Sequence, residues 1–137
     1  MKRYVVGFLF DDLTNVLLIR KNRPEWQVGY LNGVGGHIED ESELEAMIRE
    51  AKEEIGVEIK DWKSLAVVRG DDWIVYFYYA INPQAFDLAF QTTDEPIERI
   101  CAADVGSYPV ISNLIYLIPM ALDEYLVKPV IMSEVTR

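Results

Sequence analysis

Residues 35–57 read GGHIEDESELEAMIREAKEEIGV, and this stretch decides the fold that we expect for the whole chain. Apolar side chains recur in it at the spacing of one helix face, at Leu44, Met47, Ile48, Ala51 and Ile55. At about 100° per residue, Glu50, Glu53 and Glu54 fall on the opposite, exposed face. Gly56 is expected to end the helix, because a residue without Cβ readily adopts the left-handed conformation found there.

Three carboxylates on one helix face have two explanations. Glu is a good helix former and is well solvated, so an acidic surface helix needs no function. Like charges one turn apart nevertheless cost about 0.2–0.5 kcal/mol per pair. The second explanation is a site for a hard divalent cation such as Mg²⁺, which is held by a few carboxylates, water and substrate phosphates.

The stretch resembles the Nudix box of the Nudix hydrolase family, G-x5-E-x7-R-E-U-x-E-E-x-G-U, where U is a bulky apolar residue. The matching positions are, in order, Gly36, Glu41, Arg49, Glu50, Glu53, Glu54, Gly56 and Val57. Two positions depart from the pattern. The loop between Gly36 and Glu41 is one residue short, and the first U position is the small residue Ala51. Since no carboxylate is lost, the chain is identified as a MutT-like member of this family.

The resemblance implies Mg²⁺ as the cofactor, with Mn²⁺ able to substitute. The metal ligands that it implies are the Gly35 carbonyl, Glu50, Glu53, Glu54 and one carboxylate from a late loop, which we assign to Glu98 with Glu95 as the alternative. Glu50, Arg49 and Glu53 would form the catalytic group. Glu50 would orient or deprotonate the attacking water, and Arg49 would hold the carboxylates by charge-assisted hydrogen bonds.

Substrate contacts are expected just before the box. The segment Leu-Asn-Gly-Val-Gly-Gly resembles the one in the family's oxidised-purine nucleoside triphosphatases, in which the Asn touches the base; this would be Asn32. An Asn that only satisfies a turn is the alternative. Arg20 and Arg23, beside Lys21, form a basic cluster that would either contact phosphates or lie in a solvated loop. The single histidine, His37, is expected to be structural or solvent-facing.

These residues imply hydrolysis of a phosphoanhydride bond in a nucleoside diphosphate linked to a group X. A nucleoside triphosphate pyrophosphohydrolase acting on an oxidised purine nucleotide is the first expectation. Within the same class, ADP-ribose or dinucleotide pyrophosphatase activity stays open. A Nudix-like module that senses a nucleotide without hydrolysing it is the alternative of another class, although the loss of a box carboxylate would be its simplest signature.

Composition limits the partners. A length of 137 residues suits a single Nudix hydrolase domain over residues 1–137 with its own core. A net charge of −10 argues against long nucleic acids and anionic membranes as partners, and favours a nucleotide whose phosphates are met through metal ions. The only cysteine, Cys101, fits a reducing compartment. With neither a cleavage-site pattern nor an apolar run of about 20 residues, a cytoplasmic location is expected.

The remaining sequence predicts an α/β fold, a Nudix-type α/β/α sandwich with a central mixed β-sheet. Strands are expected at residues 3–10, 16–19, 65–69, 73–81 and 97–101, which are rich in Val, Ile, Tyr and Phe. A second amphipathic helix is predicted over residues 110–126, with a kink near Pro119, and a surplus apolar face on it would suit a homodimer. Residues 82–90 are expected to form a loop, and the tail from about residue 129 to be loosely ordered.

Overall fold

β1 (Lys2–Phe10) is the strand around which the sheet is built. The computed structural model describes residues 1–12 and 14–135 of the chain. β1 pairs in parallel with β6 (Trp73–Ile81) on one edge, and antiparallel with β2 (Asn15–Arg20) and β4 (Val34–His37) on the other. The other strands are β3 (Leu31–Asn32), β5 (Lys63–Arg69), β7 (Ile97–Cys101) and β8 (Val130–Ser133). The main strand order is β3-β2-β1-β6-β5-β8, and β7 pairs with β2.

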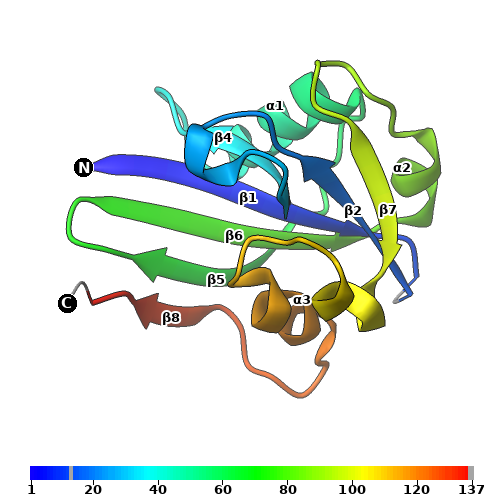
Figure 1. Cartoon of the computed structure of the whole chain (residues 1–137). Coiled ribbons are helices and arrows are strands. Elements are labelled where there is room, and N and C mark those ends of the chain that lie inside the picture. The colour runs from blue at the N-terminus through cyan, green and yellow to red at the C-terminus, as the bar shows by residue number, and fades with distance from the viewer. Residues whose placement is uncertain (13, 136–137) are drawn as a thin grey trace.

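Helices cover both faces of this mixed sheet (Figure 1). α1 (Glu43–Ile55) and α2 (Pro83–Leu88) lie on one face, and α3 (Leu114–Leu122) lies on the other. Val5 of β1 belongs to the core under α1 and α2, whereas Phe8 belongs to the core under α3. Because strand side chains alternate between faces, β1 contributes to both cores. The expected α/β/α sandwich is confirmed.

α1 ends where the sequence predicts, at Gly56, which has a φ of 74°. A capping box that the sequence signals as Ser-x-x-Glu begins it: Ser42 Oγ accepts from Glu45 N at 3.1 Å, and the Glu45 carboxylate accepts from Ser42 N at 3.0 Å. Its buried arc differs from the predicted stripe. Leu44 is 40% exposed and Ala46 is fully buried, so the arc turns toward Ala46. Two of the box carboxylates, Glu50 and Glu54, are partly buried as a result.

Residues 82–90 contain α2, so the prediction of a loop there is wrong. The Asn82 side chain caps this helix by accepting a hydrogen bond from Ala85 N at 3.0 Å. Pro83 stands in the first turn, where a missing backbone N–H leaves no helical bond unmade. Pro is thus a helix-start signal here, and Phe86 is buried against the α1 side of the core.

The terminal helix is shorter than predicted, because α3 begins at Leu114 and ends at Leu122, with Pro119 inside it. Val110 forms an isolated bridge with Leu31, and the next amide donates to the Leu31 carbonyl at 3.0 Å. The apolar side chain of Val110 is therefore buried by strand-like pairing rather than by a helix. Within residues 1–12 and 14–135, no helix combines the length and the apolar character needed to cross a membrane.

The tail is ordered where we expected it to be loose. β8 pairs in parallel with β5, with Ile131 opposite Val67, and Glu134 N donates to the Arg69 carbonyl at 2.8 Å. Val and Ile favour a strand once an edge is free to accept it, and β5 supplies that edge. Residues 136 and 137 of the predicted tail lie outside the described residues.

Candidate active site

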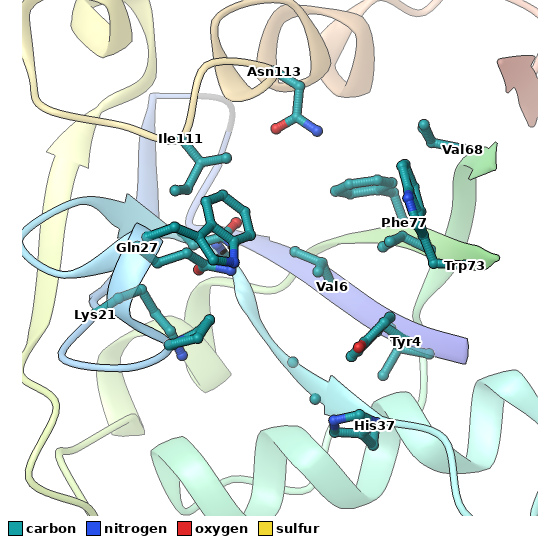
Figure 2. Close-up of a pocket in the computed structure, with 18 of the residues that line it drawn as sticks. Tyr4, Val6, Lys21, Gln27, His37, Val68, Trp73, Phe77, Ile111 and Asn113 are labelled. Atoms are coloured by element: carbon teal, nitrogen blue, oxygen red, sulfur yellow. Dashed lines mark hydrogen bonds between the residues drawn. The ribbon is translucent and has the colours of Figure 1, made fainter. Parts of the chain in front are cut away.

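A cavity of about 1040 Å³ opens on the α3 side of the sheet. Its lining comes from the short helix η1 (Glu25–Gln27), β1, β4, the end of α1, β6 and the start of α3. Figure 2 shows Lys21 and Gln27 on one side, Trp73 on the other, and Asn113 next to α3. The volume is that of a small-molecule site, and segments far apart in the sequence build it.

Beside one end of the cavity lies an acidic group, here called the acidic end, made of Glu41, Glu50, Glu53 and Glu54; Glu54 lines the cavity, and Arg49 joins the other three. Its Nε and one terminal nitrogen donate to both oxygens of Glu41, at 2.9 and 2.7 Å. The other terminal nitrogen donates to Glu50 at 2.9 Å and to Glu53 at 3.2 Å. The His37 carbonyl accepts a further hydrogen bond at 3.0 Å. One guanidinium thus joins three carboxylates to the loop before α1, which the single ammonium of a lysine cannot do.

Glu41 is placed by Arg49 although the loop before it is one residue short. The bidentate contact holds the pKa of the Glu41 carboxyl down to about 2, and the Glu39 amide, which donates to it at 3.0 Å, adds to this effect. The same contacts raise the pKa of Arg49 above its ordinary value. Glu41 is therefore ionised at neutral pH, and its contacts are those of a residue that positions Arg49.

The two glycines of the box allow the backbone to approach its neighbours closely. A Cβ on Gly36 would lie 2.6 Å from the Glu50 carboxyl carbon, and a Cβ on Gly35 would overlap the Val5 carbonyl oxygen. Gly35 and Gly36 also line the cavity. Any side chain here would displace either the Glu50 carboxylate or the pairing of β4 with β1.

Glu50 and Glu54 are partly buried, and burial disfavours the charged form of both carboxylates. Burial raises the pKa of the Glu50 carboxyl, and the contact with Arg49 opposes that rise. Burial raises the pKa of Glu54 to about 8, although nearby Lys21 and the Gly35 amide act in the opposite direction. A cation bound beside Glu54 would favour its carboxylate form.

The donors at this end suit a divalent cation. Glu50 and Glu54 offer carboxylate oxygens and Gly35 offers a carbonyl, which are hard ligands of the kind that Mg²⁺ and Mn²⁺ bind. Glu53 is more exposed, at 58% of its side chain. In the part of the chain that the structure describes, no three acidic, His or Cys side chains gather closely enough to hold a metal unaided. Mg²⁺ fits such a set, since it usually binds through one or two carboxylates, water and substrate phosphates.

The two late-loop carboxylates have different surroundings. Glu98 forms a bidentate salt bridge with Arg20, and neither residue lines the cavity. Glu95 lines the cavity and binds Lys21 at 3.0 Å. The structure thus brings Glu95, rather than the assigned Glu98, toward the box. Glu98 is opposite Leu18 in the β2–β7 register, and Arg20, two residues further along β2, reaches it on the same face.

The basic cluster is divided in the same way. Arg23 reaches the cavity but pairs with both oxygens of Asp94 at 2.9 Å in an exposed position. Lys21, which we did not single out as a substrate residue, is 15% exposed and lines the cavity. Lys21 and Arg23 both lie beyond the end of β2, and their partners distinguish them: Lys21 binds the buried Glu95, and Arg23 binds the exposed Asp94.

Asn32 lines the cavity, and its amide already has partners. Its oxygen accepts from Gly33 N at 2.8 Å, and its nitrogen donates to the Gln27 side chain at 3.1 Å. The turn-like contact that we weighed as the alternative is therefore present. Asn32 and Gln27 both line the cavity, and each amide has hydrogen-bonding capacity beyond this contact.

Asn113 is a cavity residue that the sequence analysis missed. It is the N-cap of α3, where Asn usually accepts a backbone hydrogen bond, yet its side chain makes none. Its Oδ1 is buried and has no hydrogen-bond partner among the described residues. Figure 2 shows the side chain extending from α3 toward the cavity. The available signal was an Asn before an apolar helix, but that signal normally indicates a cap.

Aromatic side chains form part of the wall. His37 lies against the Tyr4 ring, with centroids 4.5 Å apart, and both line the cavity. Trp73 also lines it, whereas Tyr76 and Tyr78 do not. Of these three aromatic residues, β6 thus presents only Trp73 to the cavity.

Comparisons with known proteins agree with this geometry. The family described as NUDIX domain matches residues 1–108 of the chain. A search of curated proteins finds no significant match. Among solved structures, MutT from a study of Aliivibrio salmonicida and Vibrio cholerae is 20% identical, with a TM-score of 0.71 over 88% of this chain and 96% of that one.

Two further structures come from Shewanella oneidensis NrtR. Its NUDIX domain in complex with ADP ribose is 24% identical, with a TM-score of 0.71 over 87% of this chain and 84% of that one. NrtR in complex with a 27-mer DNA is 25% identical, with a TM-score of 0.69 over 86% of this chain and 59% of that one.

The MutT comparison establishes a shared fold, whereas the family match also covers the box itself. The matched residues include α1, and with it Arg49, Glu50, Glu53 and Glu54, whose contacts are described above. The chain belongs to the NUDIX domain family and is a Nudix hydrolase.

Proposed function

We propose that the protein hydrolyses a phosphoanhydride bond in a nucleoside diphosphate linked to a group X, with Mg²⁺ as cofactor and Mn²⁺ able to replace it. The leading substrate class is a nucleoside triphosphate, cleaved by water to a monophosphate and pyrophosphate, with an oxidised purine nucleotide as its first member. The observation that carries this choice is one cavity that has Glu54 of the box and the two box glycines at one end and, in its wall, the side chain of Asn113, whose amide oxygen has no partner.

At the acidic end, the chain's own residues would position the phosphates and the water. When bound, a divalent cation would supply charge neutralisation and an activated water. Glu50, fixed by Arg49 at 2.9 Å, would orient that water and accept its proton, and Glu53 completes the same network. Lys21 offers a sheltered positive charge for a phosphate oxygen.

At the other end, amides would read the base. A buried acceptor without a partner costs about 1–3 kcal/mol, so a ligand N–H would recover that energy if the Asn113 amide turned to present Oδ1, which is closed to solvent in the structure, to the cavity. Purines with ring or exocyclic N–H groups offer such donors, and an 8-oxo group adds an N–H on the five-membered ring. Gln27 and Asn32 lie in the same lining, and Trp73 offers a surface for stacking.

Two specific observations favour other candidates. The NUDIX domain of NrtR forms a complex with ADP ribose, which supports ADP-ribose or a dinucleotide as an alternative substrate. The complex of NrtR with DNA supports a role in sensing or regulation. A net charge of −10 favours a small nucleotide over long nucleic acid as the partner. The single cysteine suits a cytoplasmic protein, and a homodimer stays a proposal for solution measurement.

The test is a substrate panel with Mg²⁺ in which pyrophosphate and phosphate release are measured separately. It contains the ordinary and 8-oxo nucleoside triphosphates, ADP-ribose, NADH and a diadenosine polyphosphate. We expect pyrophosphate from triphosphates, with the 8-oxo purine highest, and no turnover after chelation of the metal. Turnover of ADP-ribose alone would make ADP-ribose, rather than a nucleoside triphosphate, the substrate. Metal-dependent nucleotide binding without any turnover would favour a module that senses a nucleotide without hydrolysing it.

A further inference from the structure

Glu95 is a charged side chain fixed in the wall of the cavity. It is 5% exposed, and both of its oxygens have partners. Lys21 Nζ donates to Oε1 at 3.0 Å, and the Asn22 amide donates to Oε2 at 2.7 Å. The Glu95 amide is itself held by Thr93 Oγ1 at 3.1 Å. This carboxylate therefore has a fixed orientation, with Lys21 as its main counter-charge.

Lys21 is the cation of this wall that is both sheltered and within reach of the box. Its side chain is 15% exposed, compared with 62% for Arg23. Its charge also acts on Glu54, at the end of α1. A phosphate that entered the acidic end would meet Lys21, yet Glu95 already binds that ammonium at 3.0 Å.

We propose that Glu95 is an internal counter-anion that sets the affinity of the site for phosphate, because a substrate phosphate group must compete with it for Lys21. Glu95 then acts through Lys21 and does not take part in the chemical step. The inference rests on the proposed function in one respect, namely that phosphates occupy the end of the cavity where Glu95 and Lys21 lie. The ligand class is a phosphate or pyrophosphate group, whether free or esterified.

Two opposing effects decide the sign of the change when Glu95 loses its charge. Without the Glu95 carboxylate, the Lys21 side chain is less ordered. Fixing it on a phosphate then costs conformational entropy, which weakens that contact. Removal of a negative charge a few ångströms from an incoming polyanion strengthens binding, and in a partly buried site the electrostatic effect outweighs the ordering of one side chain. We therefore expect Glu95→Gln to bind polyphosphate more tightly, and to release it more slowly.

Glu95→Gln is a mild change in shape. The glutamine carbonyl can still accept the hydrogen bond from the Asn22 amide, so the loop keeps one of its two anchors. Glu98→Gln is the matched control, since Glu98 also pairs with a basic residue of β2, but lies outside the cavity lining. Lys21→Met removes the cation for which the two anions compete.

The experiment is calorimetric titration of inorganic pyrophosphate into the full-length protein with a chelator present and no divalent metal. We expect Glu95→Gln to lower the dissociation constant about tenfold, and Glu98→Gln to leave it within twofold. In the Lys21→Met background, Glu95→Gln should change the logarithm of the pyrophosphate dissociation constant by less than a third as much. Unchanged or weaker pyrophosphate binding by Glu95→Gln would overturn the proposal, and so would an equal gain with Lys21→Met.

The result of this titration does not depend on whether the proposed hydrolytic function is correct. Pyrophosphate binding without metal involves no hydrolysis, so it can be measured even if every substrate of the panel is inert. With Mg²⁺ and a hydrolysed nucleotide, Glu95→Gln should lower KM and leave kcat unchanged or reduced by slower product release. A large fall in kcat with unchanged KM and unchanged pyrophosphate affinity would instead make Glu95 a catalytic residue and overturn the counter-anion role.

Discussion

The acidic end beside the cavity and the amide wall of the cavity, formed by Gln27, Asn32 and Asn113, are built in opposite ways. In the acidic end, Arg49 joins Glu41, Glu50 and Glu53 through hydrogen bonds that exist before any ligand binds. In the amide wall, Asn113 leaves a buried oxygen without a partner. The first arrangement is suited to chemistry that is common to all substrates. The second is suited to selection among substrates, because only a ligand with a matching donor gains the free energy of the missing hydrogen bond.

The largest effect is expected from breaking the acidic end at Glu53. Glu53→Gln should lower kcat by roughly 10²–10³-fold, in the range seen when one charge-stabilising group is removed from an active site. The fold should survive, since this side chain is 58% exposed. Steady-state kinetics and a thermal melt check both statements, with Glu58→Gln as an exposed acidic control. Full activity of the variant would remove Glu53 from the metal-binding set.

A smaller loss is expected when the fork of Arg49 is replaced by a single ammonium. Arg49→Lys keeps the charge but cannot hold Glu41, Glu50 and Glu53 together. Activity should fall about 10–100-fold, and the free energy of unfolding by about 1–3 kcal/mol. Urea denaturation and a Mg²⁺ titration of kcat measure the two effects. If Arg49→Lys matched the wild type in both, the hydrogen-bonded fork would be irrelevant.

At the amide wall, the expected change concerns selectivity more than rate. Asn113→Ala should narrow the ratio of kcat/KM between preferred and poor bases by about tenfold, the equivalent of one hydrogen bond. Asn32→Ala should have less effect, because its amide is already bonded to Gly33 and Gln27. Competition assays with paired nucleotides give these ratios directly. A stronger effect at Asn32 than at Asn113 would reverse our assignment of the base contact.

The last prediction concerns the stability of the metal-free protein as a function of pH. The pKa of Glu54 rises from 4.5 to about 8 on folding, so the folded protein binds the extra proton between these values. The stability from this proton is fully present below pH 4.5 and is lost as the pH rises to about 8. Glu54→Gln should flatten that decline in urea midpoints measured in chelator from pH 5 to 8.5. Parallel curves for both proteins would show that Glu54 is not the group responsible.

The two parts of the site were not equally predictable. The acidic end lies within one short stretch, so the spacing of Arg49, Glu50 and Glu53 on a helix already places them together. The amide wall depends on the bridge between Leu31 and Val110, a contact between distant segments that no local pattern encodes. The same reason explains β8, whose strand exists only because β5 offers a free edge.

Local sequence patterns also led to wrong predictions where one residue type occurs in two kinds of structure. Pro83 was interpreted as a loop residue, although it begins α2. The assignment of Glu98 rather than Glu95 had no physical basis in the sequence, because both lie in one acidic segment and only the facing residues, Arg20 and Lys21, separate them. Glu98 lies within β7 and is paired with Leu18 of β2, whereas Glu95 precedes β7 and has no partner in that register.

The central claim is that the acidic end performs the reaction and the amide wall chooses the substrate. The most direct test compares kcat/KM across the ordinary and 8-oxo nucleoside triphosphates, with Mg²⁺, for the wild type, Glu53→Gln and Asn113→Ala. We predict that Glu53→Gln lowers every value by a similar factor and keeps the ranking, whereas Asn113→Ala compresses the ranking with little change in kcat. A uniform loss in Asn113→Ala, or a changed ranking in Glu53→Gln, would contradict this division of roles.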